Sequence, residues 1–463
     1  MPVTLRIAQR DYEELRHSVL ADMPREAAAF ALAGSLLHGN NLTIPVRRTL
    51  PIPGDLVTLQ REHRLEFSSQ AINGLASLCE ANQLGAVICH SHPTDIPYSP
   101  SDDTGERRIS DTLRAFTPSD VPMASLLFWP DGVTGRVWLR GKARPVPLNE
   151  IIVVGRCLKR IRTHGADAGH VRDDRTYSRQ ILAFGKKGQA AIAATKVGIV
   201  GVGGTGSSVA EQLVRLGVTD IVLVDPDNFE CSNLTRVYGT FTGWPLRRRR
   251  TKVALVAKHL RRINPAASIA AVSRHVALTQ AARALLDRDI IFLCTDDHWG
   301  RSIVNQIAYQ YVIPTINLGT RIDSKNGKIT FGAGAVDVLR PDQPCLWCKQ
   351  VLRAERVAAE SMPRSTRRTL EREGYVEGID EATPSVVSIT TTLAGLAATL
   401  FLQLVTDFMG DRGGVSRLNF DMLEGTVRRG ISDIAHACIC TKVRGFGDLR
   451  GLPTQDNLAF VDQ

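Results

Sequence analysis

The stretch Lys196–Arg236, KVGIVGVGGTGSSVAEQLVRLGVTDIVLVDPDNFECSNLTR, decides the fold of this chain. It begins with a short apolar run, 197–200, that is typical of a buried parallel strand. A glycine loop follows, and a helix is expected from about Ser207 because apolar residues recur there at helical spacing. A second β-branched run, 221–224, ends at Asp225. The stretch therefore predicts a strand–turn–helix–strand unit of an α/β fold.

Such a unit is suited to binding a nucleotide. Glycines let the backbone turn tightly and approach a phosphate, while the start of the helix offers free N–H groups and a partial positive charge. An acid about 20 residues after the loop lies where a ribose hydroxyl would bind. A sharp turn without a ligand is the alternative, but the strand, the helix and the acid together favour nucleotide binding.

Three features favour a triphosphate over NAD or FAD, although an NAD-dependent dehydrogenase remains an alternative. The loop has a doubled glycine at 203–204, and its acid is paired in the sequence Asp225-Pro226-Asp227. Cationic and amide side chains, which suit a triphosphate, follow at close intervals. They are Asn233, Arg236 and Lys252.

A second candidate site precedes this stretch. Residues 84–89 are expected to form a strand that ends at the sequence H-S-H-P. Because side chains alternate along a strand, His90 and His92 should project to the same side. An acid from the following loop would complete the three protein ligands of a catalytic zinc and leave a place for water. Asp102 and Asp103 both qualify.

Composition and charge bear on nucleic-acid binding, membrane insertion and cellular location. The net charge of +10 would suit nucleic acid or an acidic protein, but the basic residues are scattered apart from the run 247–250, so nucleic acid is not expected. The apolar segment 386–408 carries several polar groups, which favours a core helix over a membrane span. No signal peptide begins the chain and its nine cysteines form no disulfide framework, so a cytoplasmic location is expected.

The 463 residues allow two to three domains, and three segments are expected: a first domain at 1–146, a connector at 147–173 and a second domain at 174–463. In the connector, 151–161 is read as a strand or a short helix. Strands are expected at 28–37, 42–46, 125–129, 134–139, 268–272 and 290–293. Helices are expected at 68–82 and 252–263.

The patterns G-x-G-G-x-G, D-x-D and S-N-L-x-R resemble the ThiF/MoeB/ubiquitin-activating adenylyltransferase family. An entry segment at 177–185 and the sequence C-T-D-D at 294–297 extend this resemblance over about 174–440. It implies a Rossmann-like adenylation domain that uses ATP and Mg²⁺. The implied reaction is attack by the C-terminal carboxylate of a ubiquitin-like (β-grasp) protein on the α-phosphate, which depends mostly on positioning and charge neutralisation.

The resemblance also implies the roles of individual residues. Asp296 would help to place Mg²⁺. Arg179 would reach the γ-phosphate from a partner subunit, which implies a homodimer. The residues implied to bind ATP are Gly201, Gly203, Gly204, Gly206, Asp225, Asp227, Asn233, Arg236 and Lys252.

In this family two cysteine pairs hold a structural zinc, and the matching residues are Cys345, Cys348, Cys438 and Cys440. The second pair is C-x-C here, so His436 could substitute, and buried free thiols are the alternative. Since no cysteine lies between the two pairs, a thioester on the intervening loop is excluded, and Cys231 is a less favoured candidate. We expect direct transfer to a downstream thiol, such as that of a ubiquitin-conjugating-like protein, or to an amine.

The segment 90–102, H-S-H-P-T-D-I-P-Y-S-P-S-D, resembles the JAMM (JAB/MPN) metallopeptidases. This implies that the first domain is an α/β zinc isopeptidase whose metal is held by His90, His92 and Asp102. Asp102 is preferred over Asp103 because the S-x-x-D offset is fixed by one local turn. Glu26 would move the proton and Ser99 would help to hold the oxyanion.

Together the two resemblances imply a bifunctional enzyme that activates the C-terminus of a ubiquitin-like protein and cleaves at that same C-terminus. Cleavage would mature a precursor or remove a conjugate. One alternative is activation of a sulfur-carrier protein, with the peptidase trimming the carrier. Another is an activating enzyme whose JAMM domain is a non-catalytic scaffold.

Overall fold

The computed structural model describes residues 1–118, 121–163, 175–241, 250–373 and 384–456. The chain divides into two compact units, which are described separately. The first consists of Met1–Ala166, Gln310–Val312 and Val443–Gly451, and the second of Asp167–Tyr309, Ile313–Lys442 and Leu452–Gln463. Within the expected connector, 164–173 lies outside the described residues, as does 247–249 of the expected arginine run.

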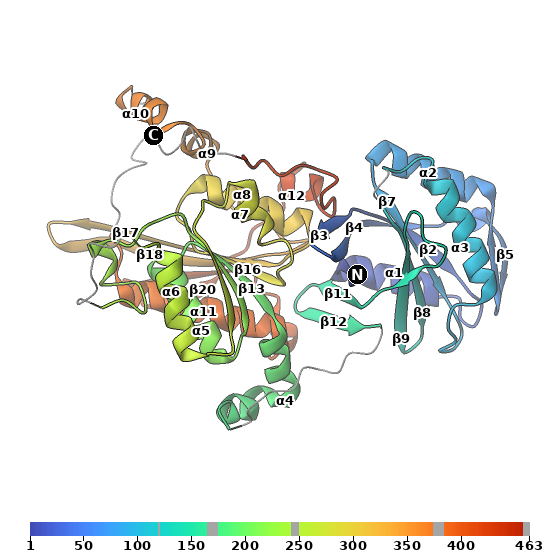
Figure 1. Ribbon diagram of the computed structural model, residues 1–463, viewed down its shortest axis with the longest axis horizontal. Coiled ribbons are helices and arrows are strands. Elements are labelled where there is room, and N and C mark those ends of the chain that lie inside the picture. The colour runs from blue at the N-terminus through green and yellow to red at the C-terminus, as the bar shows by residue number, and fades with distance from the viewer. Residues whose placement is uncertain (119–120, 164–174, 242–249, 374–383, 457–463) are drawn as a thin grey trace. The chain divides into compact units, whose positions relative to one another are not determined.

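The first unit is built on a ten-stranded mixed sheet with the order β10-β9-β8-β7-β2-β4-β1-β11-β12, in which β3 pairs with β4 (Figure 1). A separate two-stranded sheet is formed by β5 and β6. The strands are β1 (Val3–Ala8), β2 (Ala28–Ala33), β3 (Leu36–His38), β4 (Asn41–Pro51), β5 (Val57–Arg61), β6 (Arg64–Phe67), β7 (Gly85–Ser91), β8 (Met123–Trp129), β9 (Gly132–Trp138), β10 (Val146–Pro147), β11 (Glu150–Val154) and β12 (Leu158–Arg162).

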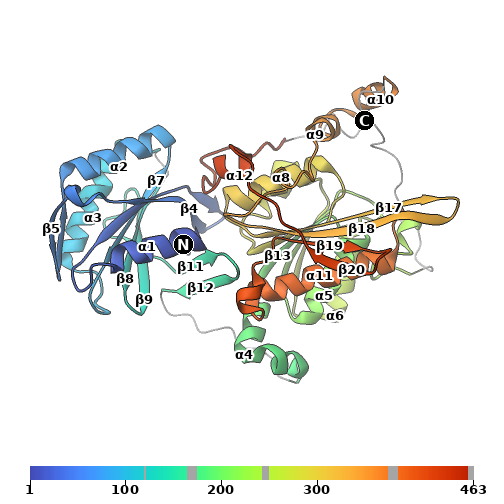
Figure 2. The ribbon, with the colours of Figure 1, turned by 180° about the vertical axis from the view of Figure 1, so that it is seen from behind.

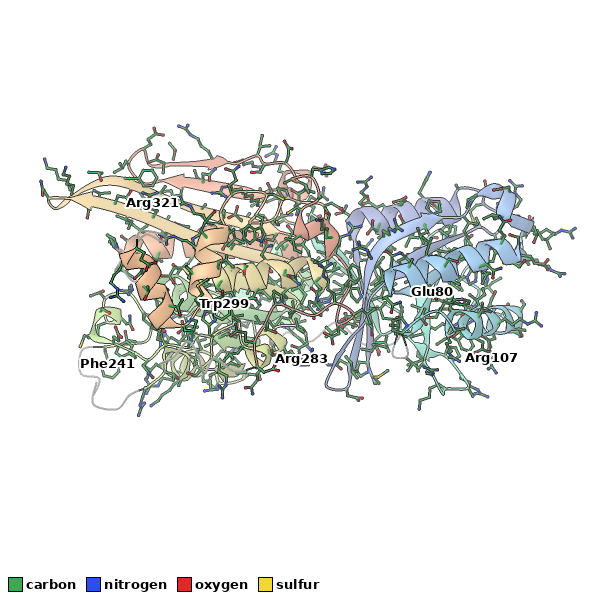
Figure 3. All side chains as sticks on the ribbon, turned by 90° about the horizontal axis from the view of Figure 1, so that it is seen from above. Glu80, Arg107, Phe241, Arg283, Trp299 and Arg321 are labelled. Atoms are coloured by element: carbon green, nitrogen blue, oxygen red, sulfur yellow. The ribbon has the colours of Figure 1, made fainter. Side chains whose placement is uncertain are left out.

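Helices cover both faces of this sheet, with α1 on one side and α2 and α3 on the other (Figures 1 and 2). The two cores follow from strand alternation, since Val87 of β7 packs with the α1 side whereas Ile88 packs with the α2 side. Glu80 of α2 and Arg107 of α3 mark the exposed sides of these helices (Figure 3). The helices are α1 (Gln9–Leu20), η1 (Gly54–Leu56), α2 (Ser69–Asn82) and α3 (Pro100–Leu113).

The expected connector at 147–173 differs from the structure, although the strand alternative for 151–161 is confirmed in part, since two strands lie there. Its residues include β11 and β12, which extend the main sheet because β11 pairs in parallel with β1. The strand β1 and the helix α1 were not anticipated from the sequence. The first unit also takes in 443–451, where Ser35 pairs with Gly447, so a part of the expected second domain completes the first unit.

The second unit is built on an eight-stranded sheet with the order β15-β14-β13-β16-β17-β18-β19-β20. Its first five strands are parallel and the last three are joined antiparallel, which is a Rossmann-like sheet with an antiparallel extension. The strands are β13 (Lys196–Val200), β14 (Asp220–Val224), β15 (Ser268–Val272), β16 (Ile290–Leu293), β17 (Thr315–Lys325), β18 (Lys328–Leu339), β19 (Arg417–Asp421) and β20 (Thr426–Arg429).

Figures 1 and 2 show α5, α6 and α11 on one side of this sheet and α7 and α8 on the other. By length and composition α11 could cross a membrane, but half of its most apolar stretch is buried, and it packs against α5, β17 and β18 as expected of a core helix. The helices are α4 (Ser178–Ala194), α5 (Gly204–Leu216), η2 (Cys231–Asn233), α6 (Lys252–Ile263), α7 (Thr279–Arg283), α8 (His298–Gln310), α9 (Ala354–Glu360), α10 (Arg364–Arg372), α11 (Val387–Thr406), η3 (Gly410–Gly413) and α12 (Ile439–Lys442).

Candidate active sites

The glycine loop lies between β13 and α5, at the carboxyl end of the parallel strands. Gly201 has φ +83°, and a Cβ there would lie 2.6 Å from the backbone nitrogen of Thr295. A Cβ on Gly206 would lie 1.8 Å from the carbonyl oxygen of Gly201, so the loop closes on itself without room for side chains. Gly203 differs, because no atom of the described residues beyond its chain neighbours lies within 4 Å of its Cβ position. The backbone at Gly203 is therefore open to a ligand such as a phosphate.

Asp225, at the end of β14, is buried beside this loop. Its carboxylate accepts hydrogen bonds from the backbone nitrogens of Val202 at 2.7 Å and Asp227 at 2.9 Å. Burial raises the pKa of Asp225, although the charge of Lys252 opposes this. Each carboxylate oxygen still has a second lone pair, so the residue fits the role of a ribose acceptor.

The polar residues of the expected triphosphate site come from three neighbouring segments. Arg236 lies along the loop, with its side chain 3.3 Å from the Cβ position of Gly204. Lys252, the first residue of α6, places Nζ 2.7 Å from Asp227 Oδ2. Asn233 is buried in η2, where its Oδ1 accepts a hydrogen bond from Glu230. The structure thus brings Arg236 to the loop, whereas Lys252 is paired with an acid.

The expected magnesium residue follows β16, the strand on the other side of β13. The chain runs from Leu293 to Asp296 past Gly201, whose Cβ position contacts Thr295, so the exposed Asp296 carboxylate lies at the same strand ends as the glycine loop. This is the switch point at which ligands bind in open α/β sheets. Arg179 is exposed in the first turn of α4, a position compatible with reaching another subunit.

A group of residues that the sequence did not reveal supports the Asp296 loop. Asp297 accepts hydrogen bonds from Thr295 and from the backbone of Gly300, and it pairs with His275 at 3.3 Å. Burial acts to raise the pKa of Asp297, but these partners lower it to about 2. The His275 ring stacks on Trp299, with 5.1 Å between the ring centroids. His275 stands alone in its segment, so no sequence motif could have identified it.

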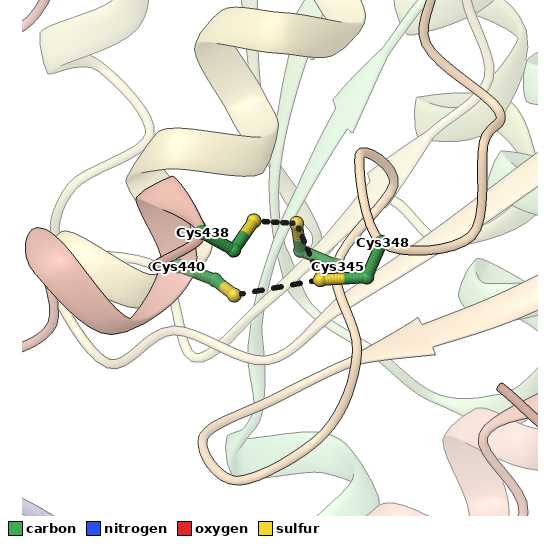
Figure 4. Close-up of side chains that lie close together, drawn as sticks. All are labelled: Cys345, Cys348, Cys438 and Cys440. Atoms are coloured by element: carbon green, nitrogen blue, oxygen red, sulfur yellow. Dashed lines mark hydrogen bonds between the residues drawn. The ribbon is translucent and has the colours of Figure 1, made fainter. Parts of the chain in front are cut away.

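The four expected zinc cysteines converge in the second unit, from a loop after β18 and from α12 and the residue before it (Figure 4). The Sγ–Sγ distances are 3.7 Å for Cys345–Cys348, 3.5 Å for Cys345–Cys438 and 3.8 Å for Cys348–Cys440. A tetrahedral zinc with Zn–S bonds of about 2.3 Å requires sulfurs about 3.8 Å apart. The C-x-C pair therefore fits a four-cysteine zinc site.

In the first unit, the pairing of β2 with β7 brings Glu26 to the histidines, because Ala28 lies opposite His90. The Nε2 atoms of His90 and His92 each lie 3.6 Å from an oxygen of Asp102, and His92 Nε2 lies 3.6 Å from Glu26 Oε1. These distances are too long for hydrogen bonds. They approach the spacing of about 3.4 Å expected between nitrogen and oxygen ligands of a tetrahedral zinc.

Two further observations test whether this site fits a metal. His90 Nε2 is buried and has no hydrogen-bond partner among the described residues, as expected of an atom that needs a ligand. His92 Nδ1 lies 2.9 Å from the carbonyl oxygen of Ile96, which can only accept, so Nδ1 is the donor and Nε2 is directed at the site. Burial, together with the charge of Asp102, raises the pKa of Glu26 to about 7, which suits an acid–base group.

Ser99 and the two candidate acids lie at the start of α3. Ser99 caps the helix, and its hydroxyl and backbone nitrogen donate to Asp102 Oδ2 at 2.8 and 2.6 Å. Asp103 turns away from the histidines and pairs with Arg136 at 2.5 Å. Of the two acids that the sequence left open, Asp102 is the one beside the histidines.

The carboxyl ends of β13, β14 and β16, with the glycine loop and its buried acid, define a nucleotide-binding domain of the Rossmann class. The model of the ThiF family matches residues 177–438, which is more than half of the chain. The chain belongs to the ThiF family. Residues 1–176 lie outside this match, and the JAMM type of the first unit stays a prediction.

Named relatives match the same part of the chain. Ubiquitin-like modifier-activating enzyme 5 of Aedes aegypti is 26% identical over 260 residues, which cover 52% of this chain and 61% of that protein. Adenylyltransferase and sulfurtransferase uba4 of Emericella nidulans is 35% identical over 145 residues, covering 30% of this chain and 29% of that protein. The crystal structure of E. coli MccB with MccA-N7isoASN has a TM-score of 0.46 at 18% identity and covers 60% of this chain and 76% of that chain.

Proposed function

We propose that the second unit uses ATP and Mg²⁺ to adenylate the C-terminal carboxylate of a ubiquitin-like protein. The observation that carries this proposal is the gathering of the open glycine loop, the buried Asp225 and the exposed Asp296 at one edge of the sheet. The similarity to ubiquitin-like modifier-activating enzyme 5 supports the choice of substrate.

The residues would act by position and charge. A carboxylate oxygen of the partner attacks the α-phosphorus, and the bond from that phosphorus to the bridging oxygen of pyrophosphate breaks. Backbone N–H groups at Gly203 and the start of α5 receive phosphate oxygens, and Arg236 offsets their charge. Asp296 would hold Mg²⁺, which supplies further charge neutralisation when bound. Lys252 would exchange Asp227 for a phosphate oxygen.

ATP–pyrophosphate exchange with candidate ubiquitin-like proteins tests this proposal. We expect exchange that requires the partner and that is lost in Asp296→Ala. Asp131→Ala removes an exposed acid of the first unit and is the matched control. ATP binding without exchange for any ubiquitin-like partner would exclude the proposed activation.

We further propose that the first unit is a JAMM-type zinc peptidase acting at the C-terminus of the same ubiquitin-like protein. Support comes from the convergence of His90, His92 and Asp102, with Glu26 beside them. Bound zinc would supply an acidified water and an electrophile for the amide carbonyl. Glu26 would take the proton from the attacking water and deliver it to the leaving amine. The Ser99 hydroxyl, which donates its one proton to Asp102 Oδ2 in this structure, would turn to donate it to the oxyanion.

Cleavage of a ubiquitin-like protein with a short C-terminal extension, and of its isopeptide conjugate, tests this activity and separates maturation from deconjugation. His90→Ala should abolish cleavage, and so should a chelator. A wild-type protein that binds zinc at these histidines but cleaves neither substrate would favour the alternative of a non-catalytic scaffold.

A second candidate for the adenylation step is activation of a sulfur carrier, favoured by the 35% identity to a protein named adenylyltransferase and sulfurtransferase. The adenylate would then be converted to a thiocarboxylate. Incubation with a sulfur donor distinguishes sulfur-carrier activation from activation for conjugation. Only sulfur-carrier activation replaces an oxygen of the partner's C-terminal carboxylate with sulfur and so raises the partner's mass.

We also propose a cytoplasmic homodimer in which Arg179 serves the partner's ATP, with transfer to a ubiquitin-conjugating-like protein. The exposed position of Arg179 supports its reach into a partner subunit. The cysteines are free thiols, which supports the cytoplasmic location. Mixing and re-forming dimers of Arg179→Ala and Asp296→Ala should restore part of the exchange activity, because a mixed dimer has one intact site. A mixture that stays inactive after subunit exchange would contradict an arginine supplied by the partner.

A further inference from the structure

Arg136 of β9 holds the helix that carries the candidate zinc ligand Asp102. Its Nη1 lies 2.5 Å from Asp103 Oδ1, and its Nε lies 2.8 Å from Glu106 Oε2. Residues three apart share one face of a helix, so the guanidinium binds one side of α3 along its first turn. Asp102 lies on the adjacent side, where it meets the two histidines. The contact of Arg136 with α3 therefore fixes the rotation of this turn.

Arg136 also supports the loop that leads to α3. Its guanidinium carbon lies 3.6 Å from the centre of the Tyr98 ring, and the Tyr98 hydroxyl lies 3.1 Å from Ser125 Oγ. The next residue, Ser99, donates two hydrogen bonds to Asp102. Arg136 therefore contacts the chain both before Asp102, at Tyr98, and after it, at Asp103.

Arg136 and Glu106 form a buried ion pair. Arg136 is 8% exposed, and its Nη2 is buried without a hydrogen-bond partner among the described residues. The buried Glu106 already accepts hydrogen bonds from Ser125 and Trp138. Buried ion pairs often add little net stability compared with apolar packing, so the geometry that this pair imposes on α3 is the effect to test.

We propose that Arg136 is a positioning residue of the zinc site, which presents Asp102 to the histidines by holding Asp103 and Tyr98. The proposal rests on the zinc site of the proposed peptidase. Residues that hydrogen-bond to a metal ligand preset its direction, and their loss typically costs about 10- to 100-fold in metal affinity. Arg136 acts one contact further out, through Asp103 and Tyr98, so the lower end of this range is expected.

The test measures zinc affinity by chelator competition and the absorption spectrum of bound Co²⁺, in the full chain. In a His90→Ala/His92→Ala variant only the cysteine site binds zinc, and the zinc bound by this variant is subtracted from that of the other proteins. Asp103→Asn releases Arg136 from the first turn at an exposed side chain. Arg136→Met/Glu106→Gln removes the buried cation without leaving a buried charge. Asp111→Asn, an exposed acid of the same helix, is the control.

We expect zinc affinity about 10-fold weaker in Asp103→Asn and in the double variant, with an altered Co²⁺ spectrum. The thermal midpoint of Asp103→Asn and all properties of Asp111→Asn should stay near wild type, and Arg136→Lys should keep part of the affinity that is lost in the double variant. Wild-type affinity and spectrum in both test variants would overturn this inference alone. A wild-type protein with no more zinc than the double-histidine variant would overturn the site itself and the inference with it.

Discussion

Gly203 and Gly206 lie in the same loop but meet different surroundings. Because a Cβ at Gly206 would lie 1.8 Å from a backbone oxygen, Gly206→Ala should destabilise the protein by about 1–3 kcal/mol or more. At Gly203 a methyl group would lie within 4 Å of nothing else in the described part of the chain, so Gly203→Ala should fold normally and yet bind ATP weakly, because the methyl obstructs the phosphates. Thermal unfolding and calorimetry measure the two effects. Normal ATP affinity in Gly203→Ala would argue against this loop as the phosphate site.

Glu26 has no role as a zinc ligand in this proposal, so its substitution should separate chemistry from binding. We expect Glu26→Gln to keep its zinc, because the amide preserves the size of the side chain, and to cleave about 10²- to 10⁴-fold more slowly for lack of a proton acceptor. Glu80→Gln, on the exposed side of α2, is the control. Zinc content and single-turnover cleavage are the measurements, and rapid cleavage by Glu26→Gln would contradict the assigned role.

At the scale of elements, Glu360 connects the end of α9 to the start of α8 through a hydrogen bond. Its Oε2 accepts a hydrogen bond from the backbone nitrogen of Trp299 at 2.8 Å. Burial raises the pKa of Glu360 to about 7 from an ordinary value of 4.5, even though this hydrogen bond acts in the opposite direction. Since α9 begins the segment after the first cysteine pair, the contact links that segment to the Asp296 loop.

The raised pKa makes stability depend on pH. The folded state binds a proton at Glu360 more readily than the unfolded state does, so this residue costs stability as pH rises from about 4.5 to 7, and the full cost is present above pH 7. Glu360→Gln should remove the cost and be more stable than wild type at pH 8, on the order of 1–3 kcal/mol, and near wild type at pH 4.5. Urea unfolding at both pH values measures this. Equal stability at pH 8 would mean that Glu360 is not desolvated.

Elements with a strong local pattern were predictable from the sequence. The helix α6 has the expected bounds because its apolar residues and the Asn264-Pro265 stop are all local. By contrast, the sequence predicts a strand or a short helix at 151–161 but not that β11 and β12 join the first sheet, because β11 pairs with β1 almost 150 residues away, as in the pair Thr4–Glu150. A register between distant strands leaves no mark in either segment. The candidate sites likewise divide into local features that the sequence predicts and distant contacts that it does not. Contiguous motifs identify the histidines and cysteines, whereas Arg136 contacts α3 from β9, a distant segment that carries no motif.

At the scale of the whole molecule, the residues that the structure describes include two groups of potential zinc ligands, one in each unit. They differ in chemistry. Four thiolates close a tetrahedral structural site, whereas two imidazoles and one carboxylate leave a position for water. Each group is built from residues of its own unit, so loading of one site should not require the other.

We therefore expect two zinc ions per chain, and one in either His90→Ala/His92→Ala or Cys345→Ser/Cys348→Ser. The cysteine variant should lower the thermal midpoint, because the metal there contributes folding energy by joining distant segments. The histidine variant should unfold near the wild-type temperature and keep pyrophosphate exchange while losing cleavage. A chelator should remove the histidine-bound zinc first, since that site has fewer protein ligands. Metal analysis after stepwise chelation measures this order, and loss of both ions in either variant would show that the two sites depend on each other.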